Sequence, residues 1–171
     1  MLVPAIFCLI YPVCLFWAAF SDLKSMTIPN RLSIVLALGF FPAAILLGLS
    51  PMLMLQHAGI GLIGLVIGFT LFAFRFLGGG DAKLIAATAI WLPWNGAVAF
   101  VIYTALLGGA FTILLLIARQ ALQIYTPTMP QWLQTLLKPK GDLPYGVAIC
   151  AGGLIVIPQT ELYIALMKLI G

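Results

Sequence analysis

The protein has 171 residues, of which 8 are Lys or Arg and 4 are Asp or Glu, so that 7% carry a formal charge. Ordinary soluble domains carry roughly a quarter. Hydrophobic residues make up 64% of the sequence, and so few polar side chains cannot cover a globule in water. The composition excludes the soluble, disordered and disulfide-scaffold classes and predicts a surface that faces lipid.

Apolar runs between polar residues predict six membrane spans, at 2–20, 32–49, 56–76, 82–94, 96–118 and 144–170. The expected fold is all-α, a polytopic bundle of about six transmembrane helices in one domain over residues 1–171. The first run lacks the basic segment of a signal peptide, so we expect it to be retained. The fourth run is about 20 Å long as a helix. It is too short to cross a hydrocarbon core of about 30 Å unaided, so we expect that its neighbours shield it or that it begins below the membrane surface.

The net charge is +4, but the basic residues are scattered between apolar runs, so we expect no nucleic-acid partner. If the N-terminus lies outside, the loops near 21–31, 75–83 and 119–143 face the cytoplasm. Seven of the eight basic residues then lie on the cytoplasmic side, and Lys168 alone lies outside. The positive-inside rule therefore predicts an outside N-terminus.

The longest polar segment, 119–142, contains three prolines, which interrupt any continuous helix. An apolar stripe within it predicts a short helix over 131–138, and its members are Trp132, Leu133, Leu136 and Leu137. We expect this helix in the cytoplasmic loop to lie at the lipid interface. Docking of a partner protein is the alternative.

Carboxylates are scarce, which narrows any acid–base chemistry to Asp22, Asp81, Asp142 and Glu161. Asp22 ends the first span and Asp81 begins the fourth, so both are expected at the cytoplasmic ends of their helices. Asp142 adjoins Lys140 in the polar loop, where a solvated charge is expected. Glu161 belongs to the last span, nearer the outer face.

Asp81 directly follows three glycines, Gly78, Gly79 and Gly80. Glycine permits backbone conformations closed to other residues, and it lets another chain approach closely. The alternative is a flexible loop in which Asp81 is only the N-cap of the next helix. That alternative leaves the glycine run and the nearby Lys83 unexplained.

Two carboxyls in a low-dielectric cleft are expected to share one proton near neutral pH. One can then act as general base on a water while the other donates a hydrogen bond to a carbonyl oxygen. No Ser–His–Asp set is expected, because His57, a predicted cap or interface residue, lies on the outer side. The cysteines lie in apolar runs without a Cys-x-x-Cys pair, so neither a metal site nor a cofactor is predicted.

Three motifs carry a resemblance to a known family. Gly78-Gly79-Gly80-Asp81 matches the Gly-x-Gly-Asp motif of membrane-embedded aspartic peptidases, and its continuation through Lys83 resembles that of prepilin peptidases. Asp22 followed by Ile28-Pro29-Asn30 resembles the first half of the family pattern. Pro144-Tyr145-Gly146 is similar to the segment that opens the family's last helix.

The resemblance implies a prepilin leader peptidase of the bacterial inner membrane, with Asp22 and Asp81 as its catalytic dyad. Gly78, Gly79, Gly80 and Lys83 would belong to the active-site loop, and the other motif residues would support it. We expect Pro29 and Asn30 to order their loop and start the second span. Lys83 either tunes the dyad or binds lipid phosphate.

The chain lacks the region with paired Cys-x-x-Cys motifs that accompanies methyltransferase activity in larger prepilin peptidases, so methylation is not implied. It resembles the short Tad/Cpa-type enzymes of Flp pilus assembly. The implied partners are a prepilin or pseudopilin substrate, the lipid bilayer and pilus assembly proteins. The glycines of the spans can serve packing within the chain, so a homodimer is not required.

Two alternatives from other classes remain. A small transporter or channel would use Asp22 and Asp81 as a proton or cation relay. A relay should place acids along the depth of the membrane, however, whereas these two share one face. A non-catalytic assembly protein with the same fold would not need either aspartate.

Overall fold

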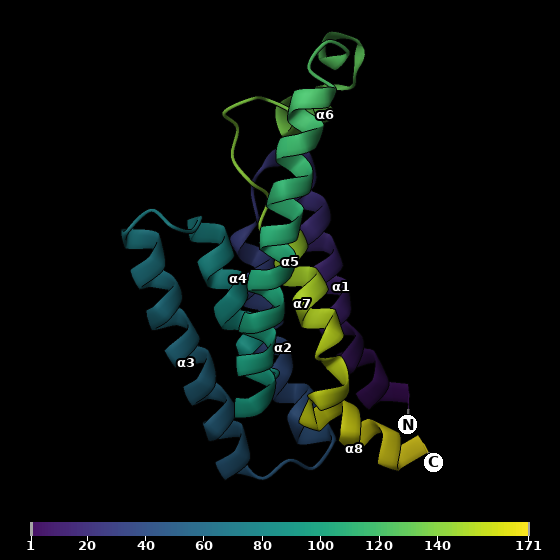
Figure 1. Ribbon diagram of the computed structural model, residues 1–171. Helices are drawn as coiled ribbons and strands as arrows, with labels where there is room; N and C mark the ends of the chain where they lie inside the picture. The colour runs from purple at the N-terminus through teal and green to yellow at the C-terminus, as the bar shows by residue number, and fades with distance from the viewer. Residues whose placement is uncertain (1, 171) are drawn as a thin grey trace.

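The computed structural model describes residues 2–170, which form eight α-helices and two short 3-10 turns, without a strand. The predicted all-α class is therefore confirmed. The helices are α1 (Leu2–Ser25), α2 (Asn30–Leu46), α3 (Pro51–Ala73), α4 (Gly79–Ala89), α5 (Trp94–Ala121), α6 (Gln131–Leu136), α7 (Gly146–Ile155) and α8 (Glu161–Ile170), and the 3-10 turns are η1 (Thr126–Thr128) and η2 (Ile157–Gln159). The long helices lie side by side, with α6 beyond one end of the bundle and α8 across the other (Figure 1).

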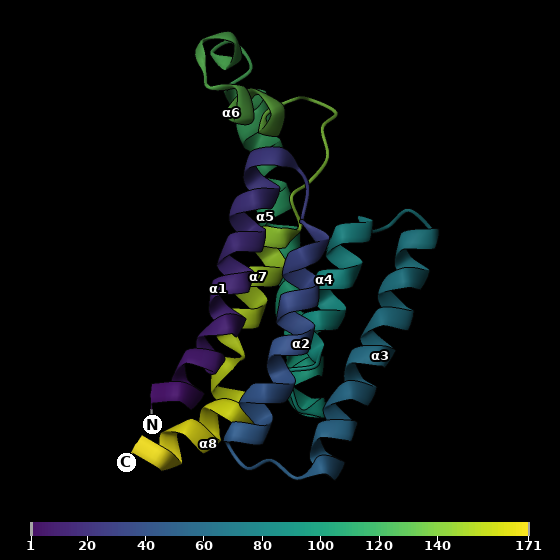
Figure 2. The same cartoon turned by 180° about the vertical axis from the view of Figure 1, so that it is seen from behind.

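Three helical segments are long and apolar enough to cross a membrane, and they are Ile6–Ser25, Pro51–Ala73 and Trp94–Ala121. The helices α2 and α7 are apolar but shorter, with 17 and 10 residues. At 28 residues, α5 is about 42 Å long, which exceeds the hydrocarbon thickness of about 30 Å. Its last turns therefore project from the bundle toward α6, as the views from both sides show (Figures 1 and 2).

The prediction of one continuous helix over 144–170 is wrong. Helix α7 ends at Ile155, and the chain turns through η2 before α8 begins at Glu161. Pro158 lies in η2, and proline has no N–H for a helical hydrogen bond and clashes with the preceding turn. The Thr160 hydroxyl then accepts a hydrogen bond of 3.1 Å from the Tyr163 N–H, which caps the new helix.

Helix α4 has 11 residues, about 17 Å of helix, and is enclosed by other helices. It packs against α3 on one side and against α2 and α7 on the others. Seven of its residues are buried. The predicted shielding of this short segment by its neighbours is confirmed, although the helix begins at Gly79, not at residue 82.

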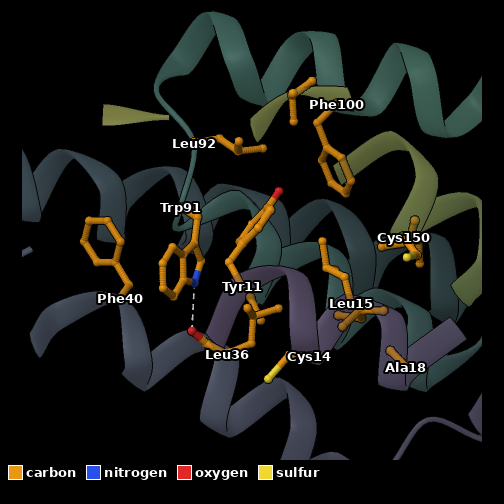
Figure 3. Close-up of a cluster of buried hydrophobic side chains, with 14 of the residues drawn as sticks. Tyr11, Cys14, Leu15, Ala18, Leu36, Phe40, Trp91, Leu92, Phe100 and Cys150 are labelled. Carbon is orange, nitrogen blue, oxygen red and sulfur yellow. Dashed lines mark hydrogen bonds between the residues drawn. The ribbon is translucent and has the colours of Figure 1, made fainter. Parts of the chain in front are cut away.

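The main hydrophobic core lies around Trp91, just beyond the last turn of α4 (Figure 3). The Trp91 indole N–H donates to the Leu36 carbonyl at 2.8 Å, and its ring packs against Tyr11 and Phe40. The Tyr11 hydroxyl donates to the Gly153 carbonyl at 3.0 Å. These bonds satisfy the polar atoms of two large buried rings. The contacts of Trp91 also tie the end of α4 to α1 and α2, and the Tyr11 bond joins α1 to α7.

A second, smaller cluster joins the ends of α1 and α5 to α6. The apolar stripe predicted in the polar segment is helical, and its Leu136 and Leu137 are buried against Leu115 of α5. Leu23 and Met26, at the end of α1, pack on the same cluster. Trp132 points away and is 42% exposed. Part of the stripe thus packs onto the bundle itself, and a position at the lipid interface stays a prediction.

Candidate active site

Asp22 and Asp81 line the same cavity, although 59 residues separate them in the sequence. Asp22 lies in the last turn but one of α1, and Asp81 lies in the first turn of α4. Their side chains are only 6% and 8% exposed. The cavity has a volume of about 600 Å³, and its other walls come from the end of α3, the loop that follows it, and the segment 141–145.

The Asp22 carboxylate is held by the beginning of α7. Its Oδ2 accepts a hydrogen bond of 2.7 Å from the backbone N–H of Gly146, the first residue of that helix. A Cβ at position 146 would lie 2.9 Å from the same oxygen, so glycine is needed for this approach. The N–H and the positive end of the α7 dipole both favour negative charge on Asp22.

The Asp81 carboxylate has a poorer set of partners. Its Oδ1 is buried and has no hydrogen-bond partner among the described residues. Burial, and next the neighbouring charge of Asp22, raise the pKa of Asp81 to about 7, against the opposing effect of the Gly78 backbone. Asp81 lies outside the three candidate spans. A carboxyl in this setting is a candidate acid because it keeps its proton near neutral pH.

The alternative role of Asp81 as a helix N-cap is wrong. The N-cap residue of α4 is Gly78, which makes no side-chain cap bond, and Asp81 is the third residue inside the helix. Its carboxylate lies over Gly78, where a Cβ would be 2.6 Å from Asp81 Oδ2. The side chain therefore lies beside the helix start and on the wall of the cavity.

The glycine run provides space and not unusual backbone angles. Among the described residues, Gly48 is the one glycine with a positive φ, so the expectation of special backbone conformations at 78–80 is wrong. A Cβ on Gly79 would lie 3.2 Å from the Phe72 ring, and one on Gly80 would lie 3.2 Å from Ile28 Cβ. These glycines allow Phe72 and Ile28 of the same chain to lie close to the start of α4, and close approach of another chain stays a prediction.

The Ile-Pro-Asn motif docks on the start of α4. Besides the contact of Ile28 with Gly80, the Lys83 ammonium donates to Asn30 Oδ1 at 2.9 Å. Asn30 was expected as a helix cap, but the N-cap of α2 is Pro29, without a side-chain bond. The Asn30 amide oxygen instead accepts from Lys83 and links the start of α2 to α4, the helix that carries Asp81. This bond to Asn30 is a role for Lys83 that the sequence did not predict.

The segment Pro144-Tyr145-Gly146 precedes and opens α7, as its motif predicts. Tyr145 lines the cavity, and its ring packs against Gly108 of α5. Pro144 is buried. The segment thus connects α5, the cavity wall and the Gly146 N–H that holds Asp22.

Several cavity residues were not predicted from the sequence. Met26 and Arg75 line the cavity and have φ angles of 52° and 61°, a left-handed region that glycine usually occupies. Asp142 is exposed, as predicted, but it also lines the cavity wall. The sequence does not indicate which non-glycine residues at helix ends adopt this conformation, so the left-handed backbone at these two positions could not be predicted.

His57 caps the end of α4 from the interior of the bundle, because its hydrogen-bond partner, Ile90, is the C-cap residue of that helix. It is 1% exposed, and its Nδ1 hydrogen-bonds the Ile90 carbonyl at 2.9 Å. Because a carbonyl can only accept, Nδ1 carries the proton in this pair. Within residues 2–170, no group of three or more His, Cys, Asp or Glu side chains is arranged to hold a metal ion.

One known family matches more than half of this chain. A model of the type IV leader peptidase family matches residues 9–113. The chain belongs to the type IV leader peptidase family. The matched stretch includes Asp22, Asp81 and the glycine run, and it ends within α5. Comparisons with the curated proteins and with the solved structures found no match.

Type IV leader peptidases are aspartic prepilin peptidases, so this protein is a hydrolase with multiple candidate membrane spans. Membership of the family implies cleavage of a prepilin leader. The wall segment 141–145 and the helix α7 lie outside the matched stretch.

Proposed function

We propose that Asp22 and Asp81 form the catalytic dyad with which this leader peptidase removes the leader of an Flp-type prepilin or a related pseudopilin. The observation that carries the proposal is the cavity itself. Two of the chain's four acidic residues, although far apart in the sequence, are both more than nine-tenths buried and line the same cavity. Burying two carboxyls side by side costs free energy, and a shared catalytic role accounts for retaining both.

The different surroundings of the two carboxyls support different roles. Asp22 accepts from the Gly146 N–H at the start of α7, which favours its ionised form. Asp81, with a pKa near 7 and an unpartnered Oδ1, is the member that keeps the shared proton. The pair titrates as a unit, so these roles describe its dominant protonation state.

Hydrolysis then follows in two balanced steps. Asp22 takes a proton from a water, whose oxygen attacks the peptide carbonyl carbon while Asp81 donates a hydrogen bond to the carbonyl oxygen. The tetrahedral intermediate collapses when the C–N bond breaks and the leaving nitrogen receives the proton from Asp22. The products are a free carboxyl on the leader and a free amine on the mature chain, and the dyad returns to its starting state.

The charge distribution supports cleavage on the cytoplasmic side of the inner membrane. Seven of the eight basic residues lie within 21–31, 75–83 and 119–143, which cover the ends of α1 and α5, the segment just beyond α3, and the starts of α2 and α4. The positive-inside rule assigns these stretches to the cytoplasm. Asp22 and Asp81 lie at these same helix ends. A leader that stays in the cytoplasm would therefore reach the cavity without crossing the membrane.

The scarcity of cysteine supports the short, Flp-type subfamily. The chain has three cysteines, at positions 8, 14 and 150, and no Cys-x-x-Cys pair. The motifs that accompany methyltransferase activity in larger relatives are thus not found in this sequence.

Co-expression with an Flp-type prepilin tests the dyad. The wild-type chain should shorten the prepilin, which a mobility shift on a gel detects. Asp22→Asn and Asp81→Asn should each slow cleavage at least a hundredfold, the scale of general acid–base contributions. The matched control is Glu161→Gln, at a half-buried acid outside this cavity, which should retain most of the activity. Wild-type cleavage by either dyad variant would refute the assignment.

A further inference from the structure

Arg119 is a buried cation whose role the dyad does not explain. It lies in the last turn of α5 and is only 5% exposed. Its guanidinium donates three hydrogen bonds, all to backbone carbonyls: Nε to Leu136 at 3.0 Å, Nη1 to Gly141 at 3.0 Å and Nη2 to Asp142 at 2.8 Å. Burying a guanidinium is costly unless its donors are satisfied, and here one rigid fork satisfies three carbonyls at once.

The three carbonyls come from the two ends of one segment. Leu136 ends α6, whereas Gly141 and Asp142 lie beyond the loop that follows it. Gly141, Asp142 and Leu143 line the cavity that contains Asp22 and Asp81. Arg119 therefore joins the end of α5 to the cavity wall, and its three bonds close the segment 136–142 into a fixed loop.

We infer that Arg119 is a positioning residue for substrate binding, because it holds the segment 136–142 in place as a wall of the active-site cavity. This inference rests on the proposed function, since it takes the cavity as the site of cleavage. Arg119 touches neither aspartate in its hydrogen bonds. It acts through the wall, which a substrate would contact in the ground state and in the transition state alike.

The structure separates this role from an effect on the dyad. Asp22 is held by Gly146 of α7, and α7 packs directly against α1 and α5. Neither the hydrogen bond to Asp22 nor this packing of α7 involves Arg119 directly. A contact that contributes equally to substrate and transition-state binding changes KM and leaves kcat unaltered.

Two variants perturb the contact from opposite sides. Arg119→Lys keeps the charge, but a single ammonium cannot reach three carbonyls in the geometry of the fork. Gly141→Ala leaves Arg119 intact, but its Cβ would lie 3.2 Å from Arg119 Nη2 and 3.2 Å from the Lys138 carbonyl oxygen, which pushes the loop off the guanidinium. The controls are Arg31→Gln, at an exposed arginine, and Gly109→Ala, in α5 with nothing within 4 Å of the added Cβ.

Limited trypsin digestion of the purified protein measures the wall without any substrate. Trypsin resists a lysine that precedes proline, so Lys140–Gly141 is its single target within 136–143. Cutting tracks the population of the opened segment. Loss of one charged hydrogen bond should therefore release fragment 141–171 about tenfold faster in Arg119→Lys. Gly141→Ala should act in the same direction, and the two controls should cut like the wild type.

Steady-state cleavage of an Flp-type prepilin by the same preparations measures the consequence. We expect KM to rise about tenfold in Arg119→Lys, with kcat within a factor of two or so of the wild type. Wild-type KM in both variants, or a loss confined to kcat, would overturn the proposal. If Arg119→Lys does not fold, Gly141→Ala decides. If the wild-type chain cleaves no prepilin, the proposed function fails. Trypsin cutting of both variants at the wild-type rate would, independently of that result, refute the contact between Arg119 and the segment 136–142.

Discussion

A single methyl group at position 146 would test how the dyad is held. In Gly146→Ala the new Cβ would lie 2.9 Å from Asp22 Oδ2 and 3.0 Å from Asp22 Cβ, whereas ordinary contacts are about 3.5 Å. The start of α7 and Asp22 must therefore separate by about half an ångström. The bond from the Gly146 N–H, now 2.7 Å, would then lengthen to the limit of a hydrogen bond at about 3.2 Å.

The expected loss follows from the strength of that bond. A hydrogen bond to a charged group contributes about 1.5–3 kcal/mol, which corresponds to a decrease in kcat of about 10- to 150-fold. Alanine is a better helix former than glycine, so α7 itself should not be weakened. Cleavage of an Flp-type prepilin by purified protein measures kcat, and the thermal midpoint confirms that the variant is folded.

Gly109→Ala is the matched control, because nothing lies within 4 Å of its added Cβ. It makes the same change in a neighbouring helix and should leave kcat as it is. If Gly146→Ala were folded and kept the wild-type kcat, Asp22 would not need the bond from α7. The role of Asp22 as the ionised member of the dyad would then be refuted.

Two further predictions concern Asp81 and the link between the motifs. Because the pKa of Asp81 is raised from 3.8 to about 7, the proton needed for catalysis is lost above pH 7, and kcat should fall about tenfold per pH unit there. The free energy of unfolding should depend on pH in the same direction as kcat. The contribution of Asp81 to it is fully present below pH 3.8 and is lost as the pH rises through 7. Asp81→Asn should therefore raise the thermal midpoint at pH 8 and change it little at pH 4. A pH-independent difference would contradict this. For the exposed hydrogen bond between Lys83 and Asn30, Lys83→Met and Asn30→Ala should each lower the free energy of unfolding by at most about 1 kcal/mol, and the double variant should be no worse than either single one; additive losses would show that the two side chains do not interact.

The local sequence was sufficient to predict the helical class and most of the helices. Hydropathy placed five of the six expected segments on observed helices, because burial of apolar runs is a local property of composition. The break at Pro158 has a local cause as well, because proline interrupts a helix even within a long apolar run. The glycine run and its aspartate were also recognisable, because a Gly-x-Gly-Asp motif is contiguous in the chain.

The arrangement around the dyad is not contiguous and required the tertiary structure. Gly146 and Asp22 are 124 residues apart, and only the packing of α7 on α1 brings them together. In the sequence, Arg119 is one of the basic residues that indicate the cytoplasmic side. Its three carbonyl partners could not be predicted, because they depend on how the loop after α6 folds back. The left-handed Arg75 is likewise set by how the end of α3 meets the cavity.

The sequence by itself therefore determined that the protein is a helical membrane protein and which two aspartates were candidates for its chemistry. Composition and contiguous motifs carry that information, because they depend on residues close together along the chain. Only the tertiary structure decided how each carboxyl is surrounded, with Asp22 held by a helix start and Asp81 left without a partner at Oδ1. Burial and charge at a site are sums over neighbours from several helices, and these neighbours exist only in the folded protein.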